Sequence, residues 1–165
     1  MDEELAALSA RLGKALVKRG WMLATAESCT GGWIAETVTA TAGSSGWFER
    51  GFVTYSNESK VELLGVSPAT LARQGAVSKE TAQEMADGAL AHSHADLTVA
   101  VTGIAGPSGG SAAKPVGMVC LAWSARRSEG TVKTRRFKGE REAVRRQTVV
   151  TALKKLIEMA EETNK

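Results

Sequence analysis

A chain of 165 residues, 43% of them hydrophobic, is long enough to bury one substantial core, and its length favours a single domain over residues 1–165. We expect neither a membrane span nor a signal peptide, because no apolar run is long enough and residues 2–4 are acidic. The net charge of +3 is mild, and two cysteines, Cys29 and Cys120, are too few for a disulfide framework, so we expect a reduced, cytoplasmic protein.

The first half of the chain alternates between the periodicities of helices and strands. Apolar residues recur at helical spacing before Gly20, and the predicted buried stripe consists of Leu5, Leu8, Leu12, Leu16 and Val17. Asn57 is the expected N-cap of a later helix that ends at Gly65. The predicted elements are, in order, a helix over 3–19, a strand over 21–24, a helix over 31–41, a loop over 43–46, a strand over 47–55 and a helix over 58–64.

The second half continues the alternation and then ends in a hairpin and a helix. Ser78 is the expected cap of a helix whose inner face holds Ala82, Met85, Ala86 and Ala89. The inner face of the last helix is expected to hold Val144, Thr148, Ala152, Leu156 and Met159. The predicted elements are a connector over 71–77, a helix over 78–91, strands over 97–102, 116–124 and 131–137, and a helix from about 140 before a frayed end at 161–165.

This order of elements predicts an α/β fold, a three-layer α/β/α sandwich with a mixed, mostly parallel sheet. In such sheets a ligand binds beyond the carboxyl ends of the strands. Three segments are expected to meet at that edge, namely 27–32, 55–60 and 102–110.

Ser28 lies where a predicted strand passes through the glycine pair Gly31-Gly32 into a helix. The backbone N–H groups and the positive dipole end of such a helix favour an anion, so a hydroxyl nucleophile there has an oxyanion hole nearby. The stretch by itself is more typical of a helix cap made by Ser28 or Thr30. Cys29 is a rival nucleophile, but no histidine partner for a thiolate can be identified in the sequence.

Lys60 is a candidate base for Ser28. In the first turn of a helix a lysine feels the positive dipole end, and burial against a strand further favours its neutral form. Tyr55, at the end of the preceding strand, brings a phenol to the same edge, where it can orient or relay the proton. The alternatives are a surface lysine and an amphipathic tyrosine. His92 and His94 are interpreted as solvated residues at a helix end rather than as metal ligands.

The glycine-rich segment 103–110 follows a predicted central strand. It lacks the terminal Gly-Lys-Ser or Gly-Lys-Thr of a Walker A loop and is not a clean Gly-x-Gly-x-x-Gly, so it is a weak signal on its own. Its N–H groups can still cradle a phosphate or a carboxylate, with Lys114 nearby.

Several long motifs together resemble the CinA C-terminal domain family. They occur in order over nearly the whole chain as Thr25-Ala26-Glu27-Ser28-Cys29-Thr30-Gly31-Gly32, Gly51-Phe52-Val53-Thr54-Tyr55-Ser56-Asn57-Glu58-Ser59-Lys60, Gly75-Ala76-Val77-Ser78, Thr102-Gly103-Ile104-Ala105-Gly106-Pro107 and Lys114-Pro115-Val116-Gly117. The likeness is closest to its stand-alone members that act on nicotinamide mononucleotide (NMN). One mild departure is Ser108 after the proline, where acidic or glycine residues are common.

The resemblance implies hydrolysis of the NMN carboxamide to nicotinate mononucleotide and ammonia, without a metal or cofactor. It also implies a serine nucleophile, a lysine base and an assisting tyrosine, which fall on Ser28, Lys60 and Tyr55. The phosphate is expected to meet the glycine loop at 106–110 or the basic first turn of the last helix. The expected substrate-binding residues are Cys29, Thr30, Gly31, Gly32, Thr102, Gly103, Gly106, Gly110, Lys114, Arg141 and Arg145.

Two other classes of function remain open on the sequence alone. A non-catalytic nucleotide-binding module would bind NMN without releasing ammonia. A DNA-associated accessory protein would use residues 126–146, where nine Lys or Arg stand against three Glu, and its binding would fall steeply with salt. Such a run is more often solvated surface, so we expect no nucleic-acid partner, whereas a homo-oligomer is compatible with the sequence.

Overall fold

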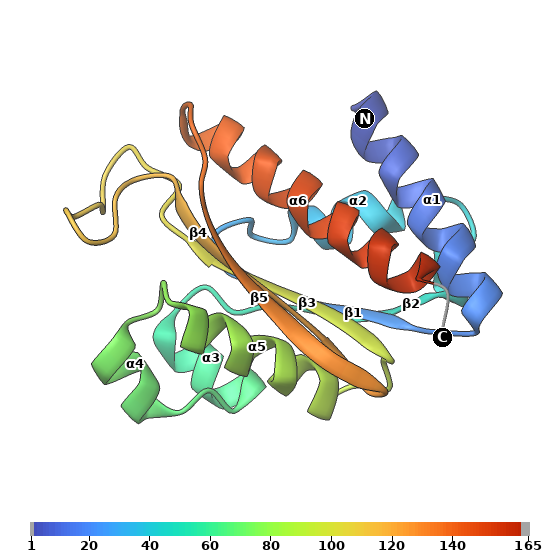
Figure 1. Cartoon of the computed structure of the whole chain (residues 1–165), viewed down its shortest axis with the longest axis horizontal. Coiled ribbons are helices and arrows are strands. Elements are labelled where there is room, and N and C mark those ends of the chain that lie inside the picture. Colours follow the sequence, from blue (N-terminus) through green and yellow to red (C-terminus); the bar gives the residue numbers. More distant parts are fainter. Residues whose placement is uncertain (1, 163–165) are drawn as a thin grey trace.

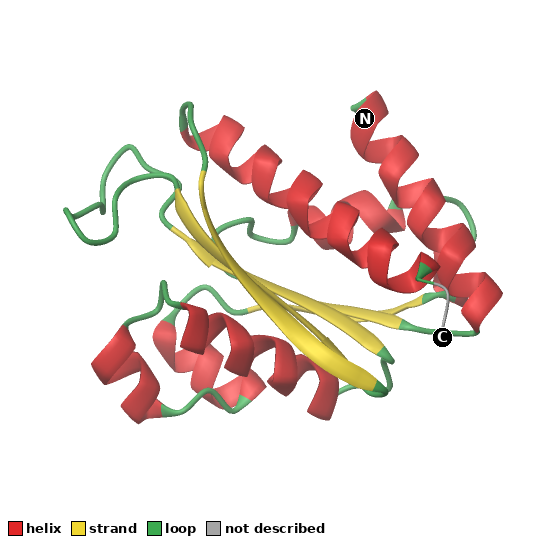
Figure 2. Ribbon diagram, viewed as in Figure 1, coloured by secondary structure: helices red, strands yellow, loops and turns green. Residues whose placement is uncertain are grey.

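Residues 2–162, which the computed structural model describes, form a five-stranded sheet with helices on both faces (Figures 1 and 2). The predicted three-layer α/β/α arrangement with a mixed sheet is confirmed. The elements are α1 (Glu3–Arg19), β1 (Leu23–Glu27), α2 (Trp33–Thr39), a 3₁₀ turn η1 (Ser44–Gly46), β2 (Phe48–Val53), α3 (Asn57–Leu64), α4 (Pro68–Gln74), α5 (Lys79–Ala91), β3 (Leu97–Gly103), β4 (Met118–Ala125), β5 (Ser128–Arg136) and α6 (Arg141–Glu161).

The sheet has the strand order β2-β1-β3-β4-β5. Strand β1 runs parallel to both neighbours, β2 and β3, whereas β3, β4 and β5 pair in antiparallel fashion. At the carboxyl end of β1, Glu27 is level with Val53 of β2 and Val101 of β3. The segments that follow these three strands therefore meet at one edge of the sheet, as the sequence predicts.

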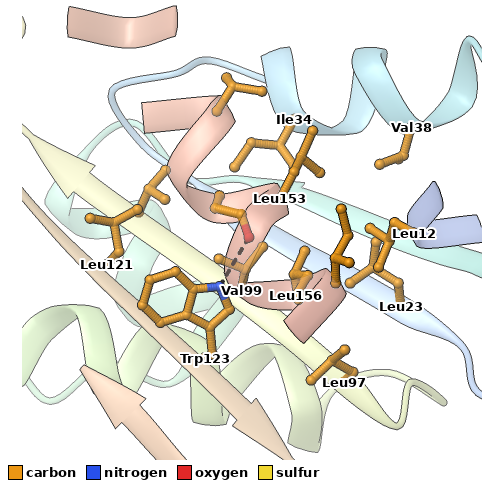
Figure 3. Packing of buried hydrophobic residues seen from close by; sticks show 14 of the residues in the cluster. Leu12, Leu23, Ile34, Val38, Leu97, Val99, Leu121, Trp123, Leu153 and Leu156 are labelled. Carbon is orange, nitrogen blue, oxygen red and sulfur yellow. Dashed lines mark hydrogen bonds between the residues drawn. The ribbon is translucent and has the colours of Figure 1, made fainter. Parts of the chain in front are cut away.

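The two faces of the sheet carry side chains of different size. Large apolar residues of β1, β3 and β4 pack beneath α1, α2 and α6, and Figure 3 shows Leu153 and Leu156 of α6 lying against them. Trp123 is fully buried there and its indole N–H donates to Ala152 O at 3.2 Å, which satisfies the polar atom of the ring. The opposite face presents mainly small residues to α5, which include Ala26, Ala100 and Ala122.

Small residues also bring α3 close to α5. A Cβ atom on Gly88 of α5 would lie only 1.9 Å from the main-chain oxygen of Leu64, the last residue of α3. The missing side chain of Gly88 lets the end of α3 pack closely against α5. Lys60 and Leu64 are the buried residues of α3. This packing directs Lys60 toward the end of β1.

Most predicted helices are confirmed, with some corrections. Val17 is 62% exposed and lies off the buried stripe. It directly follows the buried Leu16, and one residue rotates the side-chain direction by about 100° around the helix axis, so Val17 points away from the core. Residues 71–74, predicted to belong to a connector over 71–77, are part of helix α4. Ser67 accepts from Ala69 N as its N-cap, and Pro68 occupies its first turn. The N-cap of α3 is Ser56, which accepts from Ser59 N, rather than Asn57.

Other boundaries shift by one to a few residues. Strand β1 starts two residues later than predicted and continues to Glu27. Helix α2 starts at Trp33 because Gly31 and Gly32 both have positive φ angles, which excludes them from a right-handed helix. The β4–β5 turn is shorter than predicted, since Ser128 already belongs to β5. Met159 is only partly buried in α6.

None of the helices within residues 2–162 combines the length and apolar character needed to cross a membrane. The frayed end expected at 161–165 lies, beyond residue 162, outside the described residues.

Candidate active site

Ser28 is the first residue after β1, the middle one of the three parallel strands. Its N–H donates to Val101 O at 3.1 Å, so the residue remains attached to β3 although the strand has ended. The next residues turn sharply through Gly31 and Gly32 and lead into α2. The Ser28 side chain is thereby held at the sheet edge, 8% exposed, which agrees with the position predicted from the sequence.

Lys60 approaches Ser28 from α3. The residue is 1% exposed, and its Nζ lies 3.0 Å from Ser28 Oγ, 2.9 Å from Thr54 O and 3.2 Å from Tyr55 O. Burial lowers the pKa of Lys60, because desolvation penalises the ammonium form. Among residues 2–162, no carboxylate binds Nζ, so none of the described neighbours offsets that penalty with a full negative charge.

The three contacts of Nζ fit both protonation states of the lysine, since an ammonium donates to all three oxygens and a neutral amine donates to two of them and accepts from the third. Two of them are main-chain carbonyls, which only accept, so they take the two N–H groups of a neutral lysine. In that neutral form the nitrogen lone pair faces the remaining neighbour, Ser28 Oγ, which donates its proton, whereas the ammonium donates to Ser28 Oγ. The neutral form has the arrangement that a general base and its nucleophile require.

The turn after Ser28 also leaves N–H groups available. Gly31 N–H donates to Ser28 O at 3.1 Å, and Gly32 N–H is one of the backbone groups whose hydrogen bonding lowers the pKa of Glu27. The N–H groups of Cys29 and Thr30 donate to no backbone carbonyl within residues 2–162. Cys29 lines the cavity at Ser28, whereas Thr30 is fully buried and does not line it. The two N–H groups are the candidate donors for an oxyanion that forms on a substrate attacked by Ser28. Of the four expected substrate-binding residues in this turn, Cys29 and Thr30 are thus the two with an N–H group available.

Cys29 is not a competing nucleophile in this fold. Its side chain is buried in the hydrophobic core, 7% exposed, and burial raises the pKa of its thiol to about 12. The thiolate, which is the reactive form, is therefore scarce near neutral pH.

One acidic and one basic side chain, Glu27 and Arg145, hold the turn. The fully buried carboxylate of Glu27 accepts from Thr30 Oγ1 at 2.5 Å and from the N–H groups of Ile34 and Ala35, both at 2.9 Å. Arg145 of α6 donates from Nε to Cys29 O and from Nη2 to Thr30 O, both at 3.0 Å. Its guanidinium also lies over the Trp33 ring, 5.4 Å from the centroid.

These contacts change the roles expected from the sequence. Arg145 was expected to bind substrate phosphate, but two of its N–H donors are committed to main-chain carbonyls of the turn. Sequence reasoning gave Glu27 no role, although a charged residue at the end of a buried strand is itself a signal, because a buried carboxylate needs hydrogen-bond donors. Burial raises the pKa of Glu27, and its hydrogen bonds oppose that increase.

Tyr55 has a different position from the one expected for a proton relay. Its side chain is 64% exposed, and its hydroxyl accepts from Arg141 Nη2 at 3.4 Å, whereas the main-chain oxygen of Tyr55 contacts Lys60. The phenol thus lies at the solvent-exposed side of the cavity that contains Ser28 and Lys60, and not between these two residues. Arg141 also donates from Nη1 to Gly106 O at 2.7 Å, which ties α6 to the glycine-rich segment.

A cavity of about 190 Å³ opens directly onto Ser28 and Lys60. Thr102 and Gly103, two of the expected substrate-binding residues, line it, and Thr102 Oγ1 donates to Ala76 O at 2.8 Å, which fixes the opposite wall. The complete lining is Ser28, Cys29, Tyr55, Lys60, Ala76, Val77, Thr102, Gly103, Ala105 and Arg141.

The distal part of the glycine-rich segment lies outside this cavity. It projects past the edge of the sheet (yellow in Figure 1), so Gly110 is not part of the lining. Lys114 donates to Gln74 O at the end of α4 and ties the projection to that helix. The structure does not bring either residue to Ser28.

A second, more open hollow of about 460 Å³ adjoins the first through Arg141. Its other lining residues are Trp33, Glu142 and Arg145, so two guanidinium groups face it. This hollow and the cavity give the site two compartments, one around the Ser28 hydroxyl and one lined by two arginines, one glutamate and Trp33.

A family model for the CinA C-terminal domain matches residues 5–160. The chain belongs to the CinA C-terminal domain family. Members of the family that resemble it over almost their full length include proteins named nicotinamide-nucleotide amidohydrolase PncC. The one from Escherichia coli strain K12 is 54% identical over 94% of both chains, and the one from Pseudomonas putida is 50% identical over 97% of this chain and 99% of the relative.

The fold of the CinA family is also found by structural comparison. The crystal structure of competence/damage inducible protein CihA from Agrobacterium tumefaciens superposes with a TM-score of 0.93, at 48% identity and over 96% of both chains. The fold in which the end of β1 and helix α3 bring Ser28 and Lys60 together is therefore shared with a protein whose structure was determined by crystallography.

Proposed function

We propose that this chain is a nicotinamide-nucleotide amidohydrolase that converts NMN and water into nicotinate mononucleotide and ammonia. The contact of Lys60 Nζ with Ser28 Oγ at 3.0 Å carries the proposal, because it supplies a desolvated base for a hydroxyl nucleophile. The names of the full-length relatives supply the substrate class.

The reaction begins when Ser28 Oγ attacks the carboxamide carbon and neutral Lys60 accepts the hydroxyl proton. The positive pyridinium ring withdraws electrons from the carboxamide and makes its carbon more electrophilic. The N–H groups of Cys29 and Thr30 bind the oxyanion of the tetrahedral intermediate. Lys60 then donates its proton to the leaving nitrogen, and ammonia departs from a nicotinoyl ester on Ser28.

Hydrolysis of the ester repeats these roles with water as the nucleophile. Lys60 removes a proton from water, the oxyanion forms again in the same N–H pair, and the proton returns to Ser28 Oγ as the acid leaves. Each cycle consumes one water and releases one ammonia, and the enzyme regains its starting protonation.

The two compartments accommodate the two ends of the substrate. The smaller cavity takes the carboxamide and its ring, and the hollow with Arg141 takes the phosphate. Both cysteines are buried and free, which fits the reducing cytoplasm, where pyridine nucleotides are recycled.

The test is release of ammonia from NMN by the purified chain, with nicotinate mononucleotide identified as the second product. Nicotinamide and glutamine serve as amides without the nucleotide. We expect turnover of NMN and little of either control. Binding of NMN without ammonia release would instead establish a non-catalytic nucleotide-binding module.

A further inference from the structure

We propose that Glu27 is a positioning residue for the amide hydrolysis, and that its carboxylate keeps the oxyanion-binding N–H groups in place. The inference rests on the proposed function and deepens it. Glu27 touches neither Lys60 nor the Ser28 side chain in its hydrogen bonds, so it acts through the turn that follows it.

The carboxylate substitutes for a helix cap that the sequence lacks. Gly32, the N-cap of α2, has no side chain to accept from the first N–H groups of the helix. Glu27 supplies both oxygens instead: Oε1 accepts from Ile34 N–H and Oε2 from Ala35 N–H. Because Glu27 also ends β1, one residue fixes the distance and angle between the strand and the helix.

The same carboxylate reaches into the turn itself. Thr30 Oγ1 donates to Glu27 Oε1 at 2.5 Å, and both residues are fully buried. Thr30 N–H is one of the two candidate oxyanion donors, so this contact determines where that donor points. Arg145 binds the carbonyl oxygens of Cys29 and Thr30, which leaves the N–H groups of these two residues as the polar groups of the turn that bind no main-chain carbonyl within residues 2–162.

Glu27→Gln is the informative change. An amide keeps the size of the side chain but replaces one acceptor oxygen by a donor NH₂ group, which then faces an N–H group of α2. The turn must shift to relieve that contact. Since loss of one oxyanion donor lowers kcat by about 10² to 10³, we expect Glu27→Gln to lower kcat by about 100-fold.

Glu36→Gln is the matched control. Glu36 is an exposed acidic residue in the first turn of the same helix. Its replacement by glutamine also removes an acidic group near this helix end, but it leaves the contacts of the turn unchanged. Its kcat and KM should remain within about twofold of the wild type, because only a screened dipole interaction is lost.

The experiment compares kcat, KM and NMN affinity, the last measured by calorimetry in a Ser28→Ala background with and without Glu27→Gln. A positioning role lowers kcat while NMN affinity stays the same, because the oxyanion forms only during the reaction. A merely stabilising role lowers the melting temperature and leaves the kcat of the folded protein unchanged, and that result would overturn the inference.

Thr30→Val provides a second variant in case Glu27→Gln fails to fold. It keeps the shape of the side chain and the Thr30 N–H group and removes only the hydroxyl that binds Glu27. We expect kcat to fall about tenfold at unchanged NMN affinity, as loss of a hydrogen bond to a charged group lets the turn move. If each variant that folds has the wild-type kcat, the role of Glu27 is contradicted and the proposed function stands. If the wild-type chain releases no ammonia from NMN, both the proposed function and the role of Glu27 are overturned.

Discussion

Lys60 Nζ meets Ser28 Oγ at 3.0 Å in a buried position where its other two neighbours are the carbonyl oxygens of Thr54 and Tyr55. The fold thus provides both the hydrogen-bond acceptors that orient a neutral amine and the burial that favours it. A histidine is not needed in this arrangement. An imidazole is a base near neutral pH because its unperturbed pKa is low, and desolvation lowers the pKa of the lysine so that it can serve as the base instead.

Ser28→Ala should reduce ammonia release from NMN by about 10³-fold or more, since the substitution removes the attacking atom. The protein should stay folded and still bind NMN, because Ser28 Oγ is a small group at the cavity wall. Cys29→Ala is the companion variant and should retain at least about a tenth of the wild-type rate. A Cys29 variant that is dead beside an active Ser28 variant would move the nucleophile to the thiol.

Lys60→Arg and Lys60→Met should both be nearly inactive. A guanidinium keeps its proton at any accessible pH, and methionine has no basic group. In the wild type the rate should rise with pH through an apparent pKa below that of free lysine, because burial lowers the Lys60 pKa and only the neutral amine is a base. Steady-state rates from pH 6 to 10 test this, and a rate that is independent of pH over that range would contradict it.

The same pKa shift makes a prediction for stability. The folded-state pKa of Lys60 lies below its unfolded value of about 10.4, so between the two the unfolded chain binds more protons. The free energy of unfolding of the wild type, relative to that of Lys60→Met, should therefore rise as the pH increases through this interval. Urea denaturation of both proteins at several pH values measures the difference, and a difference that falls with pH would show that the folded state favours the ammonium form.

The general plan of this fold follows from periodicity and capping signals in the sequence. The strand–turn–helix at Ser28 and the buried stripe of α5 are local patterns, so residues 25–33 and 78–91 suffice to predict them. The short helix α4 was missed because its seven residues include no buried one and hence show no apolar stripe, although Ser67-Pro68 is a helix start signal.

The site was predictable to the extent that it depends on strand ends. Ser28 and Lys60 are 32 positions apart, and they meet because parallel strands place their carboxyl ends at one edge. Side-chain direction at that edge is not encoded in a local pattern. The Tyr55 phenol turns outward to Arg141, and Arg145 turns inward to the carbonyls of the turn. These contacts join α6 to residues 86 and 116 positions away in the sequence, so only tertiary packing sets them.

The position of Arg145 changes the prediction for phosphate recognition. With two of its donors bound to Cys29 O and Thr30 O, Arg145→Ala should lower kcat by disturbing the turn rather than weaken binding of the phosphate alone. Arg141 is the better candidate for the phosphate, since it is exposed and lines both compartments. Its fork has five N–H donors, and the contacts with Gly106 O and Tyr55 Oη use two of them.

Nicotinamide riboside, which lacks the phosphate, should therefore be a much poorer substrate than NMN, by about 100-fold in kcat/KM, as expected for loss of a charge-assisted contact. Arg141→Ala should raise the KM for NMN and leave the riboside nearly unaffected, so the gap between the two substrates should narrow about tenfold. Arg146→Ala is the control, because this arginine of the same helix pairs with Asp2 and Glu4 instead of lining the cavity. Its substrate gap should equal that of the wild type. If Arg141→Ala slows both substrates by the same factor, Arg141 acts through Gly106 and Tyr55 on the shape of the cavity, and the phosphate is bound elsewhere.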